Sequence, residues 1–70
     1  MHESIVAYIQ AALRVCESDE ERSVFLNQWF ISRQGQRIGA DPFERGAFAR
    51  DAGMTPRELG LWNRASAGIN

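Results

Sequence analysis

The sequence predicts an all-α protein that forms one small domain over residues 1–70. Two observations lead to this prediction. Apolar residues recur at the spacing of an α-helix, and three separate segments have the residue pattern of a helix start. The apolar fraction of 44% is ordinary for a globular protein. We expect four helices, arranged as an N-terminal helical hairpin (residues 1–34) and a second helix pair (residues 42–66).

Three segments predict where helices begin. Ser18 followed by Glu21 fits a capping box, in which each side chain accepts from the other residue's backbone N–H. Asp41-Pro42 places proline at the first helical position, where its missing N–H costs nothing. Thr55-Pro56-Arg57-Glu58 combines both features. Helices are therefore expected to begin near residues 19, 42 and 56, with ends near 34, 52 and 66, and Gly68 ends the last one.

The first expected helix, residues 3–17, has one apolar stripe, formed by Ile5, Val6, Ile9, Ala12, Leu13 and Cys16. Because Cys16 continues this stripe, we expect a buried structural thiol. It is the only cysteine, so no intrachain disulfide can form, which fits a reducing compartment. With no signal-peptide pattern and no apolar run long enough for a bilayer, we expect a cytoplasmic protein that does not enter a membrane.

The second expected helix, residues 19–34, is apolar around most of its circumference. Such a helix needs burial on more than one side. In so small a chain, one side can face the core and another side a second chain. We therefore predict an association surface, in a homodimer or with another protein, formed by Phe25, Leu26, Trp29 and Phe30. Residues 35–40 contain two glycines and are expected to form a loop.

Charge is unevenly distributed along the chain. The formal net charge is −1, so the whole chain lacks the basic footprint of a typical nucleic-acid binder. Residues 1–35 carry −2 and residues 36–70 carry +1. Every basic residue is an arginine, which suits binding of phosphate or carboxylate, although genomic base composition gives the same result.

The segment from Arg45 to Arg64, "RGAFARDAGMTPRELGLWNR", has the residue types of a helix-turn-helix. Ala49 is the small residue where two helices cross, and Gly53 suits a left-handed turn. The residues expected to point inward are Phe48, Ala52, Met54, Leu59 and Trp62. This segment resembles the helix-turn-helix of AraC-type transcriptional regulators at Ala49, Ala52-Gly53-Met54-Thr55-Pro56 and Leu59. The resemblance implies DNA binding, with the helix from Thr55 in the major groove.

That resemblance covers only the last third of the chain. AraC-type domains contain two such motifs, and this chain has room for one. The segment Arg50-Asp51-Ala52-Gly53-Met54-Thr55, together with Glu58, also resembles a family of short arginine-rich bacterial proteins of poorly defined role.

The outward positions of the motif decide between two functions. They map onto Thr55, Pro56, Arg57, Gly60, Leu61 and Arg64. Arg57 and Arg64 are good donors to guanine or phosphate, and Thr55 is a weaker one. Gly60 offers no contact, and Leu61 suits a protein surface better than a base.

One hypothesis is a small transcriptional regulator that binds DNA as a dimer, in which Arg45 and Arg50 add contacts to the phosphate backbone. The alternative is a protein–protein interaction module, such as a phage- or plasmid-type inhibitor or anti-activator of a host regulatory protein. A DNA binder should place Arg45, Arg50, Arg57 and Arg64 on one continuous face. If Asp51 and Glu58 interrupt that face, the protein-binding alternative gains.

The sequence indicates no enzyme, cofactor or metal site. His2 and Cys16 are the only histidine and cysteine, whereas a zinc site usually takes four ligands. Nucleophilic catalysis needs a nucleophile, a base and an orienting group. The acidic residues 19–21 stand at a helix start, where the helix dipole favours them.

Overall fold

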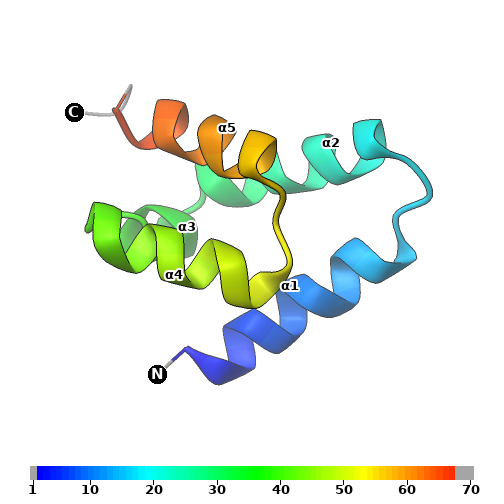
Figure 1. Cartoon of the computed structure of the whole chain (residues 1–70), viewed down its shortest axis with the longest axis horizontal. Coiled ribbons are helices and arrows are strands. Elements are labelled where there is room, and N and C mark those ends of the chain that lie inside the picture. The colour runs from blue at the N-terminus through cyan, green and yellow to red at the C-terminus, as the bar shows by residue number, and fades with distance from the viewer. Residues whose placement is uncertain (1, 68–70) are drawn as a thin grey trace.

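The computed structural model describes residues 2–67, which form five α-helices and no strand. They are α1 (Glu3–Val15), α2 (Asp19–Phe30), α3 (Arg33–Ile38), α4 (Pro42–Ala52) and α5 (Pro56–Ala67). The all-α prediction is confirmed (Figure 1). None of these helices is long and apolar enough to cross a membrane.

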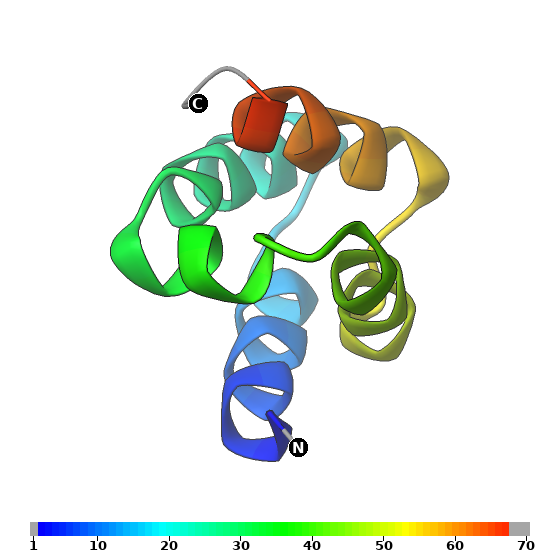
Figure 2. The same ribbon diagram turned by 90° about the vertical axis from the view of Figure 1, so that its left-hand side faces the viewer.

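The helices form two layers. In one layer α2 packs against α5, and in the other α1 packs against α4 (Figures 1 and 2). The short helix α3 connects α2 to α4 and packs on α2. The expected hairpin of residues 1–34 is therefore not the main packing unit, because α1 and α2 each pair with a helix from the second half of the chain.

The predicted helix starts are confirmed by their hydrogen bonds. Ser18 Oγ accepts from Glu21 N at 3.1 Å, and the Glu21 carboxylate accepts from Glu17 N at 2.8 Å. The return bond thus lies one residue earlier than a standard capping box. Asp41 Oδ1 accepts from Phe43 N at 2.9 Å, with Pro42 in the first turn.

The predicted loop at residues 35–40 is wrong, because Arg33–Ile38 form α3. The second helix ends at Phe30 instead of residue 34, and Ser32 begins a new helix by accepting from Gly35 N at 3.1 Å. A Cβ at Gly35 would collide with the carbonyl group of Trp29. Gly35 therefore permits a close approach of two helices and does not break one. The first helix ends at Val15, two residues early, and Gly68 lies outside the described residues.

Four aromatic side chains form the centre of the core. Phe30 stacks on Trp62 with ring centroids 5.2 Å apart, and Trp29 stacks on Phe48 at 5.3 Å. Aliphatic and small residues complete the core: Ile9, Leu13, Leu26, Ile38, Ala49 and Ala52. Burying each large side chain stabilises the fold by roughly 1.5–3 kcal/mol.

The predicted association surface needs a correction. Leu26, Trp29 and Phe30 are buried in the chain's own core, so they offer little surface to a partner. Only Phe25 is half-exposed among the four residues. Contacts of α2 with α3 and α5 inside one chain account for the buried part of its apolar pattern, whereas Val24 and Ile31 remain exposed. Cys16 is half-buried, and its Sγ donates to the Ala12 carbonyl at 3.3 Å.

Candidate nucleic-acid interface

The corner between α4 and α5 is built around Gly53. Its φ of 86° lies in the left-handed region, which a residue with a Cβ adopts only at a cost. Met54 N donates to Ala49 O at 2.9 Å, and Gly53 N donates to Arg50 O at 3.2 Å. These two bonds are a Schellman motif, which satisfies the last carbonyls of α4 and turns the chain sharply.

The start of α5 is fixed by a reciprocal capping box. Thr55 Oγ1 accepts from Glu58 N at 3.1 Å, and Glu58 Oε1 accepts from Thr55 N at 2.9 Å. The sequence predicted this cap. Its consequence is that the Thr55 hydroxyl, although exposed, already has a structural role.

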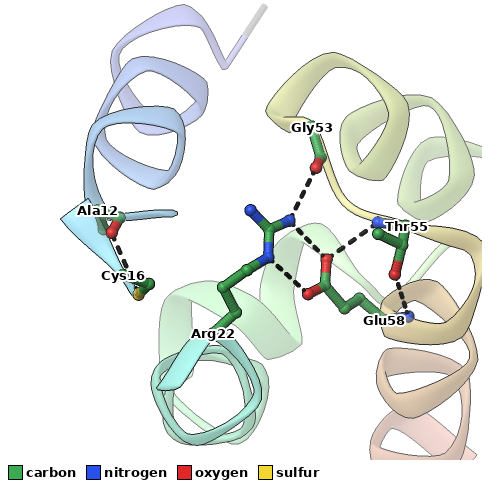
Figure 3. Close-up of polar contacts among 6 residues, drawn as sticks. All are labelled: Ala12, Cys16, Arg22, Gly53, Thr55 and Glu58. Carbon is green, nitrogen blue, oxygen red and sulfur yellow. Dashed lines mark hydrogen bonds and ion pairs between the residues drawn. The ribbon is translucent and has the colours of Figure 1, made fainter. Parts of the chain in front are cut away.

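Glu58 is also bound by an arginine of α2. Arg22 Nε and Nη2 each donate to one carboxylate oxygen of Glu58 at 2.9 Å, and Nη2 also donates to the Gly53 carbonyl at 3.1 Å (Figure 3). Glu58 is only 4% exposed. No sequence pattern indicates a role for Arg22, since its partner is 36 residues away and only the fold brings them together.

The charges of this pair stabilise each other. The hydrogen bond from Arg22 lowers the pKa of Glu58, and it outweighs burial, which acts in the opposite direction. The backbone N–H of Thr55 lowers the pKa of Glu58 further. The same pairing raises the pKa of Arg22 above its ordinary value. Both groups are therefore ionised, and together they hold α2 against the α4–α5 corner.

The inward positions of the motif lie as predicted. Phe48, Ala49, Ala52 and Trp62 are buried, and Met54 and Leu59 pack against the core. Figure 2 shows α4 almost end-on while α5 runs across it, so the two helices cross at an angle.

Three residues on the outer side of α5 share one face, because they are spaced by three and four positions. We call Arg57, Gly60 and Arg64 the α5 stripe. Both arginines are exposed, and neither has an ionic partner among residues 2–67. Leu61 is half-buried and packs against the core, so it lies beside this stripe and not at its centre.

Neither acidic residue of the motif interrupts the α5 stripe. Glu58 is turned inward to Arg22. Asp51 is exposed and lines a groove between α4 and α1, to which no residue of α5 contributes. The outward side of α5 therefore carries two positive charges and no negative one.

The two arginines of α4 differ. Arg45 is half-buried, and its Nε donates to Asn63 Oδ1 at 2.7 Å while Nη1 donates to the Gly39 carbonyl. It joins the start of α4 to α5 and is only partly free for phosphate. Arg50 is exposed near the end of α4. The four arginines thus do not form the one continuous face expected of a DNA binder, and only Arg57 and Arg64 share a face.

Asn63, which was not among the predicted site residues, is exposed on α5, and its Oδ1 accepts from Arg45 Nε. An asparagine amide can bond adenine with two hydrogen bonds in the major groove. The signal that could have found it is its spacing of three residues from Gly60 in the outward direction.

No family model matches the chain, and neither the curated proteins nor the solved structures contain a match to it. The resemblance to AraC-type regulators therefore rests on the residues of the 45–64 segment alone.

Proposed function

We propose that this protein binds double-stranded DNA through α5 and regulates transcription. The observation that carries the proposal is the inward burial of Glu58 against Arg22. As a result, Arg57 and Arg64 are the only charged side chains on the outer face of α5. Anionic DNA is the partner that such a face suits, since phosphate contacts by arginine supply most of the non-specific affinity of DNA-binding proteins.

The spacing of the α5 stripe fits the major groove. The two arginines are seven positions apart, which corresponds to about 10 Å along a helix. That distance equals roughly three base-pair steps of B-DNA. Gly60 stands between the arginines with no atom near the position of its missing Cβ. The backbone of α5 can therefore approach the bases closely, and Arg57 and Arg64 act as guanine or phosphate donors on either side.

A dimer would present two copies of α5 and so make more contacts with DNA than one small chain can make. Because Leu26, Trp29 and Phe30 are buried, we place the dimer surface at the apolar patch, which we define as Tyr8, Val15, Val24 and Phe25. The first three are 55%, 77% and 56% exposed. The Tyr8 and Phe25 rings are 6.0 Å apart, so α1 and α2 contribute to one surface.

The test is a titration of fluorescently labelled duplex DNA at several salt concentrations. We expect binding that weakens steeply with salt. Arg57→Gln/Arg64→Gln should reduce the steepness by about two in the slope of log K against log salt. The matched control is Arg14→Gln/Arg33→Gln, which removes the same charge from exposed positions outside α5. Absence of binding at low salt, or equal loss in the control, would contradict DNA binding by α5.

The alternative is the protein–protein interaction module, and the apolar patch favours it as much as it favours a dimer. Leu61 gives it less support than the sequence suggested, because this side chain packs partly against the core. A pull-down from host lysate tests the alternative. Recovery of a single stoichiometric partner that is lost in a Val24→Asp variant would support it, and recovery of only non-specific proteins would count against it.

A further inference from the structure

A groove of about 650 Å³ runs between α1 and α4, away from the α5 stripe. Its apolar lining comes from both helices: Val6, Ala7, Ala47 and Phe48. Its polar lining is His2, Glu3, Gln10, Glu44 and Asp51. No residue of α5 contributes to it, so an inference about this groove does not depend on DNA binding.

The charge of the groove has one sign. Glu3, Glu44 and Asp51 supply three carboxylates, and the lining contains no arginine. His2 lies at one end, with its Nε2 3.7 Å from Glu44 Oε1. The groove therefore combines an apolar floor with an acidic rim.

Helix stabilisation explains only part of this acidity. Glu3 and Glu44 stand in the first turns of α1 and α4, where the helix dipole favours a carboxylate. Asp51 stands in the last turn of α4, where the dipole disfavours it. Its backbone carbonyl accepts from Gln10 Nε2 at 2.7 Å, but its carboxylate has no cationic partner among residues 2–67. The negative charge of the rim is therefore not fully compensated within residues 2–67, so it can attract a positively charged partner.

We propose that this groove binds a basic amphipathic helix of a partner protein. Apolar residues at positions i, i+3 or i+4, and i+7 of that helix would lie on the floor, in the manner of other helix-in-groove complexes. Lysine or arginine residues on its flanks would face the rim carboxylates. Glu3 and Gln10 are two turns apart on α1, a distance of about 10 Å. The anchors at i and i+7 of the bound helix would be the same distance apart.

The probe is a labelled helical peptide of about 15 residues, with leucine at the anchor positions and lysine elsewhere. Two comparison peptides separate the contributions. One replaces every lysine by glutamate, and the other has the same composition in an order without an apolar face. We expect binding of the first peptide, at least about tenfold weaker binding of the reordered one, and no binding of the acidic one.

Variants locate the site. Removing the rim charges with Glu3→Gln/Glu44→Gln/Asp51→Asn should weaken binding about tenfold, because each exposed charge pair adds little alone and three are removed together. The matched control, Glu17→Gln/Asp19→Asn/Glu20→Gln, removes the same charge near the start of α2 and should leave affinity within about twofold. Ala47→Phe should weaken binding by filling the groove, with circular dichroism as the check on folding.

Three outcomes would overturn the proposal: equal affinity for the reordered peptide, equal loss in the two charge-removal variants, or unchanged affinity in folded Ala47→Phe. The DNA titration gives an independent result. Loss of DNA binding together with intact peptide binding would reject the proposed function and keep this one.

Discussion

At the scale of single residues, the Arg22–Glu58 pair connects stability to the proposed site. The side chain of Glu58 is 5% exposed and that of Arg22 is 22% exposed. Both oxygens of Glu58 accept from the arginine, and one also accepts from Thr55 N. Removing one member of a buried pair leaves the other charge without compensation, which costs more than the pair contributes.

The pair predicts a specific dependence of stability on pH. Because the pKa of Glu58 is lower in the folded chain than its ordinary value of 4.5, its ionised form stabilises the fold above pH 4.5. That contribution is lost as the pH falls from 4.5 through the lower folded value. The raised pKa of Arg22 adds nothing in this range, since an arginine stays charged.

Glu58→Gln should therefore lower the free energy of unfolding at pH 7 by about 1–3 kcal/mol. It should also flatten the fall in stability below pH 4.5, the ordinary value for Glu58. Urea denaturation from pH 7 to pH 3 measures both effects. Glu20→Gln, at an exposed position of α2, is the control and should change little. Equal pH slopes in the wild type and Glu58→Gln would show that Glu58 is not the group responsible.

At the scale of the helices, local signals in the sequence were sufficient to place most elements. The three N-terminal caps act within four residues of chain, and α4 has the predicted bounds of Pro42–Ala52. The break after Phe30 was missed, because the apolar pattern continues through Ile31 and hides the Ser32 cap. The pairing of α1 with α4 was also missed, since such a contact joins distant segments and leaves no local signal.

The positions of the candidate site residues could also be predicted only in part from the sequence. Helical spacing was enough to place Arg57 and Arg64 on one face. It was not enough to show that Leu61 packs on the core or that Arg45 is held by Asn63 and Gly39. Those features depend on how α5 packs against α2 and α4. The periodicity of one helix carries no information about its packing on other helices.

Replacing two glycines, one inside α4 and one at the α4–α5 corner, by alanine should have opposite effects on stability. Gly53→Ala should lower the free energy of unfolding by about 1 kcal/mol, because its φ of 86° is unfavourable for alanine. Gly46 lies inside α4 with no atom near the position of a new Cβ. Gly46→Ala should therefore raise stability by up to about 1 kcal/mol. Thermal unfolding measures both, and a stabilising effect of Gly53→Ala would contradict the left-handed corner.

At the scale of the whole molecule, the buried face of α2 is not accessible to a second chain, so the proposed dimer surface must lie elsewhere. Trp29 and Phe30 of α2, which the sequence predicted to contact a second chain, instead stack on Phe48 and Trp62 inside the core. The apolar side chains that remain exposed are those of the apolar patch of α1 and α2, together with Ile31 and Phe43 outside it. Single exposed apolar residues are common, but Tyr8 and Phe25 contact each other across α1 and α2, which makes this group the candidate for the proposed interaction surface.

Val24 is the best position at which to test the proposed dimer. It is 56% exposed, so a charge there leaves the core intact, whereas Phe25 packs partly against the core. Sedimentation velocity should show a wild-type dimer and a Val24→Asp monomer, since burying an unpaired carboxylate costs several kcal/mol. Phe43→Asp is the matched control, because Phe43 is 86% exposed on α4 and lies outside the patch. It should remain dimeric.

The DNA titration then connects the dimer to function. A dimer places two copies of α5 on one duplex, and the second contact becomes effectively intramolecular, so its loss weakens binding by roughly a hundredfold or more. Val24→Asp should therefore bind a two-site duplex no more tightly than a one-site duplex, while the wild type prefers two sites. A wild-type chain that is monomeric at all concentrations, or a dimeric Val24→Asp variant with normal helicity, would place the association surface away from the apolar patch.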